Sequence, residues 1–336
     1  MKRYNLCLLG FGNVGRALVA LLREKSDELR ARYRIEWRIT GVATRRVGWH
    51  AAPDGFEPGA LLDGLVGAAQ SAPSASLREW LEAAGCDVLF ETTTLDPHAG
   101  QPAIEHVRAA LEAGAHVVTA NKGPVVYAYE ELTELARRRG RRFLFEATVA
   151  DCLPVFSLFR EALPAARVRA FSGVFNSTTN VILDAMGAGL SFDEGVRRAQ
   201  SLGVAESDPS NDVDGWDAAV KVCALARVLL GAPARPDEIE RRGIRALPPA
   251  AVQAAHAAGR PFRLVGRARH EDDRLVARVA PEQVAAGDAL ALARGTSLLV
   301  RFELDVLPGL VLLAEQPNLK STAYALLADF INAVKQ

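Results

Sequence analysis

The chain has 336 residues, of which 49% are hydrophobic and 24% are charged, and its formal net charge is zero. This length has room for about two domains. The balanced charge, without a basic stripe, argues against nucleic acid or an anionic membrane as a partner. Four isolated cysteines, without a CxxC or HExxH motif, indicate reduced thiols and no zinc site. We find no secretory signal and no transmembrane run, so we expect a cytoplasmic protein.

A glycine-rich turn follows the first predicted strand. The strand spans 4–9, the turn at 10–15 reads GFGNVG, and a helix is predicted over 16–32. Gly10 would make the tight turn, Gly12 would let the backbone approach a pyrophosphate, and Gly15 would let the helix pack on the strand. A purely structural turn is the alternative. The motif predicts a dinucleotide site built from Gly10, Phe11, Gly12, Asn13, Val14 and Gly15.

The end of the second predicted strand, at 35–43, bears on the choice of cofactor. An acidic residue there would bind the ribose of NAD, but this chain has Thr44, Arg45 and Arg46. An arginine can accommodate a 2′-phosphate, so Arg45 favours NADP over NAD. A solvated loop charge is the alternative.

Strands and helices alternate through the rest of the first half. We predict a surface loop or short helix over 46–76, helices over 77–84, 101–113 and 129–139, and strands over 87–92, 116–120 and 142–149. This alternation predicts an α/β fold with a Rossmann-type doubly wound parallel sheet. Ligands of such sheets bind beyond the carboxyl ends of the strands. The polar residues at those ends are Thr92, Thr93, Asn121, Lys122 and Glu146.

The second half has closely spaced strands, which predict an α+β domain with a mixed sheet. The expected strands span 168–175, 262–269, 274–280, 297–304 and 310–314. The expected helices span 155–162, 176–186, 191–202, 236–258 in pieces, and 321–334, and Ser191 with Glu194 forms a capping box.

An acidic loop precedes an apolar helix expected over 218–230. The loop carries Glu206, Asp208, Asp212 and Asp214, and the helix holds only two charges, Lys221 and Arg227. Asp217 and Lys221 are four residues apart and share one helix face. One interpretation is an N-cap at Asp214 and a surface ion pair. The grouping of carboxylates around a lysine in apolar surroundings instead favours a site that binds an ammonium group and moves a proton.

Five motifs, in order, resemble homoserine dehydrogenase. They are GFGNVG at 10–15, TANKG at 119–123, EATV at 146–149, GVFNSTTNVIL at 173–183 and LGVAESDPSNDVDGWDAAVK at 202–221. The resemblance implies reversible NAD(P)-dependent interconversion of L-homoserine and L-aspartate 4-semialdehyde, in threonine and methionine biosynthesis. It also implies a homodimer with a dinucleotide-binding domain at 1–150, a substrate-binding and dimerisation domain at 151–315, and a C-terminal helix at 316–336 returning to the first domain.

The resemblance also assigns roles to single residues. It implies catalytic roles for Lys221, Lys122 and Asp217. We expect cofactor contacts from Thr92, Thr93 and Lys122, which lie at the carboxyl ends of predicted strands. The resemblance implies substrate contacts for Glu206, Asp212, Asp217, Ser177 and Thr178. In some members the positions of Glu146 and the Val149 carbonyl bind a monovalent cation, which we therefore also expect here.

Several segments depart from the family pattern. A glycine-rich turn is replaced by 150–152 (ADC), a glycine by Ser177, a tyrosine by Val204 and a GAGG-type loop by 315–320 (EQPNLK). These departures leave two alternatives: a dehydrogenase of another small amino or hydroxy acid, or a non-catalytic NADPH-binding protein. The presence of both lysines argues against the second alternative. We also expect no regulatory domain and no fused kinase.

Overall fold

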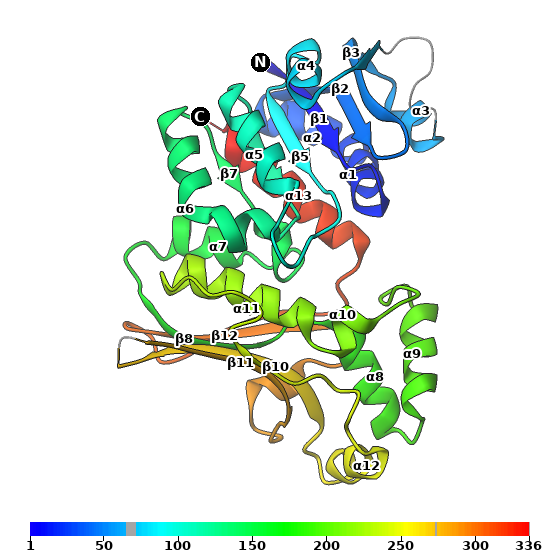
Figure 1. The fold of residues 1–336 in the computed structure, drawn as a ribbon, viewed down its shortest axis with the longest axis vertical. Helices are drawn as coiled ribbons and strands as arrows, with labels where there is room; N and C mark the ends of the chain where they lie inside the picture. Colours follow the sequence, from blue (N-terminus) through cyan, green and yellow to red (C-terminus); the bar gives the residue numbers. More distant parts are fainter. Residues whose placement is uncertain (65–71, 273, 336) are drawn as a thin grey trace. The chain divides into compact units, whose positions relative to one another are not determined.

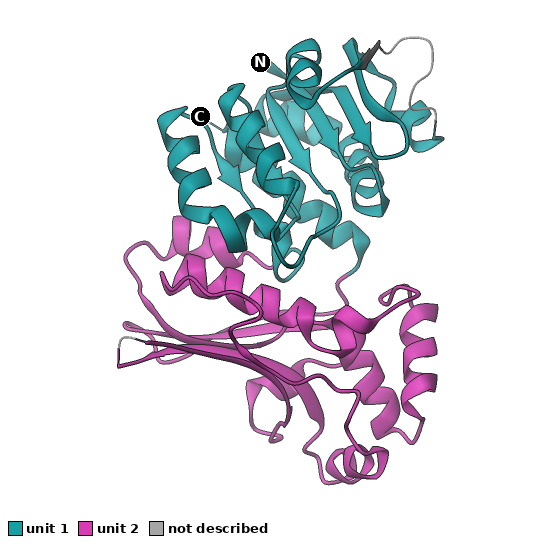
Figure 2. Ribbon diagram, in the orientation of Figure 1, with its two compact units in different colours: residues 1–152, 318–336 teal, residues 153–317 magenta. Residues whose placement is uncertain are grey.

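The chain forms two compact units. The computed structural model describes residues 1–64, 72–272 and 274–335. Unit 1 comprises Met1–Cys152 and Asn318–Gln336, and unit 2 comprises Leu153–Pro317 (Figure 2). No helix in the described ranges combines the length and the apolar character that a membrane span requires.

Unit 1 is built on a Rossmann-type sheet. Its described strands follow the order β4-β3-β2-β1-β5-β6-β7, and those from β2 to β7 across the sheet run parallel (Figure 1). The predicted doubly wound fold is therefore confirmed. The strands are β1 (Lys2–Leu9), β2 (Ile35–Thr44), β3 (Gly48–Phe56), β4 (Ala72–Ser74), β5 (Val88–Glu91), β6 (His116–Thr119) and β7 (Phe143–Leu144).

The segment 46–76 is only partly the surface loop or short helix that was predicted. It contains the antiparallel strands β3 and β4 and the short helix α3 (Pro58–Leu62), while 65–71 lie outside the described residues. The glycines and prolines that indicated a loop are tolerated because these strands extend one edge of the sheet.

Helices cover both faces of this sheet, with two further differences from the prediction. They are α1 (Asn13–Glu24), α2 (Ser26–Tyr33), α4 (Leu77–Ala83), α5 (Ala103–Glu112), α6 (Gly123–Arg138), the 3₁₀ turn η1 (Glu146–Thr148) and α13 (Leu319–Val334). The helix expected over 16–32 is two helices, because the backbone leaves helical geometry at Lys25. The strand expected over 142–149 ends at Leu144, and Glu146 begins η1.

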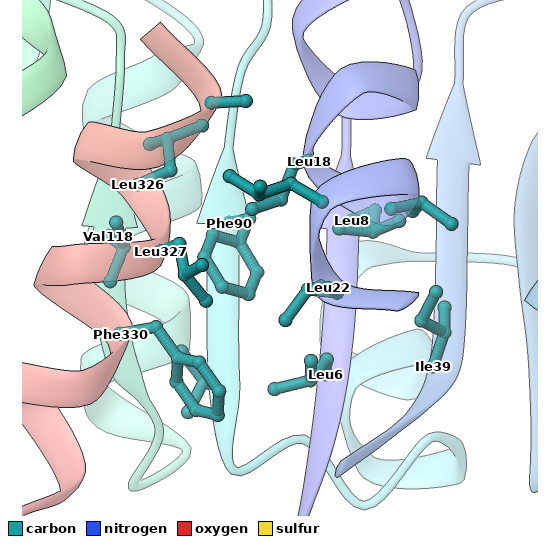
Figure 3. Close-up of a cluster of buried hydrophobic side chains, with 14 of the residues drawn as sticks. Leu6, Leu8, Leu18, Leu22, Ile39, Phe90, Val118, Leu326, Leu327 and Phe330 are labelled. Atoms are coloured by element: carbon teal, nitrogen blue, oxygen red, sulfur yellow. The ribbon is translucent and has the colours of Figure 1, made fainter. Parts of the chain in front are cut away.

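The core of unit 1 joins the two ends of the chain. Leu18 and Leu22 of α1 and Leu327 and Phe330 of α13 pack over Phe90 of β5 (Figure 3). All five side chains are buried, so α13 covers the same face of the sheet as α1. Burying a side chain of this size contributes roughly 1.5–3 kcal/mol.

A buried carboxylate attaches α13 to the turn after β7. Asp329 is 1% exposed, and its carboxylate accepts a hydrogen bond from the Glu146 backbone N–H at 2.7 Å. A charged acceptor at the start of η1 satisfies an N–H group that no helical carbonyl reaches. The position of Glu146 thus depends on a residue 183 positions further along the chain.

Acid is expected to destabilise unit 1 through His116. Burial, followed by Arg141 and Lys2, lowers the pKa of His116 from 6.5 to about 4, and its Nδ1 accepts a hydrogen bond from the Arg142 N–H at 3.1 Å. The folded state favours the neutral ring, so stability falls as pH drops below 6.5 and the loss is complete below about 4. The full shift is worth about 3 kcal/mol, and partial exposure reduces the expected loss to roughly 1–2 kcal/mol.

Urea unfolding as a function of pH checks this expectation. His116→Asn keeps an acceptor but does not titrate, so its stability should depend less on pH between 6.5 and about 4. His256→Asn, at an exposed histidine, is the control and should keep the wild-type profile. Equal acid dependence in all three proteins would contradict the assignment.

Unit 2 is built on a mixed sheet, as predicted. Its described strands follow the order β13-β12-β8-β10-β11-β9, and all neighbours are antiparallel except β11 and β9. The strands are β8 (Val168–Val174), β9 (Glu240–Arg241), β10 (Phe262–Glu271), β11 (Arg274–Gln283), β12 (Leu298–Leu304) and β13 (Leu310–Ala314). The helices are α7 (Val155–Ser157), the π-helix η2 (Leu158–Ala162), α8 (Ser177–Gly187), α9 (Phe192–Ser201), α10 (Ser210–Val213), α11 (Trp216–Leu229), α12 (Pro249–Ala257) and the 3₁₀ turn η3 (Ala289–Leu292).

The start of α11 differs from the expected N-cap at Asp214. The cap is Gly215, whose φ of +82° places it in the left-handed region that glycine tolerates best. Asp214 instead ends α10 and pairs with Arg245 at 3.1 Å. The body of α11 packs on β10, where a Cβ at Gly266 would come within 2.5 Å of Val222. The absence of a side chain at Gly266 therefore lets this helix lie close to the sheet.

Candidate active site

The turn after β1 has the geometry of a dinucleotide-binding turn. Gly10 has a φ of +90°, and a Cβ there would lie 2.6 Å from the Thr92 carbonyl oxygen. A Cβ at Gly15 would lie 2.9 Å from the Gly10 carbonyl oxygen. The absence of a side chain at Gly15 therefore lets α1 start directly beneath the turn. Gly12 is the N-cap of α1 and has no described atom within 4 Å of its added Cβ. The open side of Gly12 and the N-terminus of α1 fit a bound phosphate group.

A cavity of about 700 Å³ opens beside this turn, at the carboxyl ends of β1, β2 and β5. This volume is in the range of small-molecule and cofactor sites. The turn after β2 contributes Arg45, an exposed side chain without a carboxylate partner among the described residues. Thr44 holds this turn, because its hydroxyl accepts from the N–H groups of Arg46 and Val47 at 3.3 and 3.2 Å. The residues that line the cavity include Gly10, Gly12, Thr44, Arg45, Trp49, Thr92, Thr93, Thr94, Pro102 and His106.

Unit 2 carries the second group of predicted residues, organised around Lys221. The ammonium of Lys221 lies 2.8 Å from the Asp217 carboxylate and donates to the Phe175 carbonyl oxygen at 2.6 Å. The two charged side chains are 14% and 18% exposed, so this is not the surface ion pair that we considered from sequence. The lysine is held in place by two acceptors from different elements.

Asn176 joins the carboxylates of this cluster. Its side-chain amide donates to Asp212 at 2.6 Å and to Asp217 at 3.0 Å, while its oxygen caps α8 by accepting from the Thr179 N–H at 2.9 Å. Burial, reinforced by the charge of Asp217, raises the pKa of the Asp212 carboxyl group. A positively charged ligand near Asp212 would therefore be stabilising.

The remaining predicted substrate residues occupy three environments. The Thr178 hydroxyl donates to the Val204 carbonyl oxygen at 2.6 Å, and the Ser177 hydroxyl donates to the Thr296 carbonyl oxygen at 2.7 Å. Glu206 is exposed, and its backbone carbonyl accepts from Gln200. Thr178 is thus next to the Asn176 cluster, whereas Glu206 lies on an exposed loop.

Glu146 and Val149 lie in and just after η1, and both are buried. Among the described residues, no three His, Cys, Asp or Glu side chains gather as ligands of one metal ion. A single carboxylate with backbone carbonyls is a weaker donor set, of a kind that suits a monovalent cation better than a transition metal.

The sequence did not single out Asn176, which joins the two carboxylates near Lys221, or the buried Glu91. Asn176 was part of a motif, but only its neighbours Ser177 and Thr178 were assigned. Glu91 ends β5 and is fully buried. A polar residue at the carboxyl end of a parallel strand was the available signal for Glu91.

Together, the glycine turn, the Rossmann-type sheet and the lysine–carboxylate cluster define an NAD(P)-dependent oxidoreductase. Family models agree with this class. Residues 154–331 match a model described as homoserine dehydrogenase, and residues 10–146 match its NAD-binding domain. The chain belongs to the homoserine dehydrogenase family.

Individual relatives cover nearly the whole chain. An NAD(+)-dependent homoserine dehydrogenase of Pseudomonas canavaninivorans is 34% identical over 99% of this chain and 96% of its own length. A homoserine dehydrogenase of Methanocaldococcus jannaschii is 30% identical over 98% of each chain. The crystal structure of a putative homoserine dehydrogenase from Archaeoglobus fulgidus, 30% identical, superposes with a TM-score of 0.86 over 99% of this chain and 100% of that one. The structure of a hyperthermophilic archaeal homoserine dehydrogenase mutant in complex with NADPH is 28% identical, and it superposes over 99% of this chain and 98% of that one with a TM-score of 0.81.

Proposed function

We propose that this chain catalyses the reversible oxidation of L-homoserine to L-aspartate 4-semialdehyde, with NADP preferred over NAD. The observation that carries the proposal is the position of Lys221, half-buried in an apolar helix and held by Asp217 and the Phe175 carbonyl oxygen. Membership of the homoserine dehydrogenase family supports the choice of substrate.

The proposed chemistry divides between the cofactor and Lys221. Bound NADP would supply the acceptor for the hydride of the carbinol carbon. The neutral amine of Lys221 takes the proton of the substrate hydroxyl. Loss of that proton and of the hydride turns the carbinol group into the carbonyl group of the product. Asp217 orients the amine through its 2.8 Å contact. Lys122, at the end of the loop after β6, is proposed as a second lysine of the reaction.

The acidic groups of unit 2 are proposed to bind the ammonium of the substrate. Asp212 is the strongest candidate, because burial raises its pKa and a cationic ligand would offset that cost. Ser177, Thr178 and Glu206 are proposed as further substrate contacts. The hydroxyl groups of Ser177 and Thr178 already donate within the protein, so their backbone groups or lone pairs would meet the ligand.

The cavity of unit 1 is proposed to hold the adenosine half of the cofactor. The residues from Gly10 to Gly15 would bind the pyrophosphate, and Thr92 and Thr93 would border the cofactor further along. Arg45 would bind the 2′-phosphate of NADP. The Pseudomonas relative is named as NAD(+)-dependent, so family membership does not decide between the two cofactors. The preference for NADP is therefore proposed from Arg45.

We further propose a homodimer in the cytosol. The sheet of unit 2 bears a hollow of about 390 Å³ whose lining includes Ser172, Arg267, Arg278 and Glu303. Val276, which also lines this hollow, is 42% exposed. Small residues with charges of both signs suit a surface that meets its own copy. Analytical ultracentrifugation checks the assembly, and a monomer at micromolar concentration would contradict it.

A monovalent cation is proposed at Glu146 and the Val149 carbonyl. Titrating potassium or sodium chloride into the assay, against a salt of a large organic cation, separates site binding from ionic strength. A rate that depends only on ionic strength would contradict this cation site.

A substrate panel tests the proposed function. At fixed NADP, L-homoserine should be oxidised far faster than 4-hydroxybutyrate, which has the same hydroxyl but lacks the ammonium group that Asp212 would bind. Faster turnover of another small amino or hydroxy acid would contradict homoserine as the substrate. It would direct attention to the positions at which this chain departs from the family pattern, among them Ser177, Val204 and Asp151.

A further inference from the structure

Glu91 is a fully buried carboxylate at the end of β5, and the proton transfer proposed above does not use it. Its exposed fraction is 0%. Burying a carboxylate is costly unless hydrogen-bond donors surround it. An apolar side chain would fill the same space at a lower cost in free energy. The role of Glu91 is therefore sought in the hydrogen-bond donors that it orients.

Hydrogen-bond donors reach Glu91 from two segments of unit 1, and a third segment, α5, lies beside its carboxylate. One carboxylate oxygen accepts from the Thr93 N–H at 3.2 Å and from the Thr93 hydroxyl. The other accepts from the Thr119 hydroxyl of β6 at 2.9 Å. His106 of α5 places its Nδ1 3.6 Å from the first oxygen. The carboxylate therefore contacts the loop after β5, the end of β6 and the helix that borders the cavity.

A second layer of hydrogen bonds extends this connection to Lys122. The Thr119 hydroxyl accepts from the Asn121 N–H at 2.9 Å. The Asn121 side chain donates back to the Thr93 carbonyl oxygen at 3.2 Å and accepts from the Gly123 N–H at 2.9 Å. The loops carrying Thr93 and Lys122 thus form one closed network with Glu91 at its base.

We propose that Glu91 is a positioning residue, which fixes the two loops that present Thr93 and Lys122 to the cofactor. This inference rests on the proposed function, since it assigns these loops to the cofactor and to the reaction. Glu91 touches neither the cofactor nor the substrate in this scheme. It acts through Thr93 and Thr119, and through Thr119 on Asn121. A displacement of about 1 Å in such groups costs up to a hundredfold in rate.

Glu91→Gln tests the proposal, because it keeps the shape of the side chain and removes half of its acceptor capacity. We expect the dissociation constant of NADPH to rise about tenfold and kcat to fall about ten- to a hundredfold. The KM for homoserine should change little, because the proposed ammonium contacts lie in unit 2. A purely structural role would lower the melting temperature but leave these constants of the folded enzyme unchanged.

Two further variants keep the experiment decisive. Thr119→Val removes one donor to Glu91 and should act in the same direction, with effects that are not additive with those of Glu91→Gln. It carries the test if Glu91→Gln does not fold. Glu105→Gln is the control, because Glu105 is an exposed carboxylate on α5 next to His106, and it should behave as wild type.

The possible failures are distinguishable. If the wild-type chain does not oxidise homoserine, the proposed function fails, while NADPH affinity still reports on the network. If the wild type is active and folded Glu91→Gln has wild-type kcat and NADPH affinity, the positioning role of Glu91 is overturned.

Discussion

Replacing Lys221 with arginine is expected to lower the rate of homoserine oxidation by about a thousandfold or more, with little change in NADPH affinity. Arginine keeps the positive charge beside Asp217, but its guanidinium does not release a proton near neutral pH and so cannot act as a base. The cofactor cavity belongs to unit 1, and Lys221 belongs to unit 2. The substitution should therefore separate chemistry from cofactor binding.

Lys221→Met provides the matched comparison, because it keeps the length and apolar character of the side chain and removes the amine. Asp217 would keep its hydrogen bond from Asn176, so the fold should survive. Steady-state rates and NADPH titration with both variants check the expectation. Substantial turnover by either folded variant would exclude Lys221 as the group that takes the hydroxyl proton.

Replacing Arg45 with alanine is expected to raise the KM for NADP by about ten- to a hundredfold and to leave the KM for NAD nearly unchanged. The reason is the loss of a charge-assisted hydrogen bond to the 2′-phosphate, which NAD lacks. Arg45 lines the cavity and has no carboxylate partner among the residues that the structure describes, so its guanidinium is available to a ligand.

Arg46→Ala is the control for this experiment. Arg46 lies on the same turn and is also exposed, but it is not part of the cavity lining. Its loss removes the same charge from the same surface and should have a much smaller effect. Equal changes in the KM for NADP in the two variants would mean that Arg45 acts only through the general electrostatics of this surface. An unchanged preference of Arg45→Ala for NADP over NAD would contradict the assignment of Arg45 to the 2′-phosphate.

Local features of the sequence predicted the cofactor half of the molecule well. The glycine turn could be placed from sequence because the spacing of its glycines is characteristic of the motif. Gly10 and Gly15 are needed where a side chain would clash with the backbone of Thr92 and of Gly10. The same local reasoning failed over 46–76. Turn-forming residues there lie in strand β3. Only the antiparallel pairing of β3 with β2 shows that this segment is a strand.

Long-range contacts account for most of what the sequence left undetermined. Asn176 bridges Asp212 and Asp217, which are 36 and 41 positions away, and no pattern near Asn176 indicates those partners. Glu91 depends in the same way on Thr119, 28 positions further on. The motif around Lys221 singled out Lys221 and Asp217, and only the fold shows which groups hold them.

The proposed reaction can be measured as the initial rate of NADP reduction by purified wild-type protein with L-homoserine, at mildly alkaline pH. Mild alkali is chosen because oxidation releases a proton and the lysine must be partly neutral. We expect rapid, saturable turnover with NADP and slower turnover with NAD. Tight NADPH binding without any oxidation of homoserine would contradict this expectation, and would indicate a different substrate or a protein that binds the cofactor without using it.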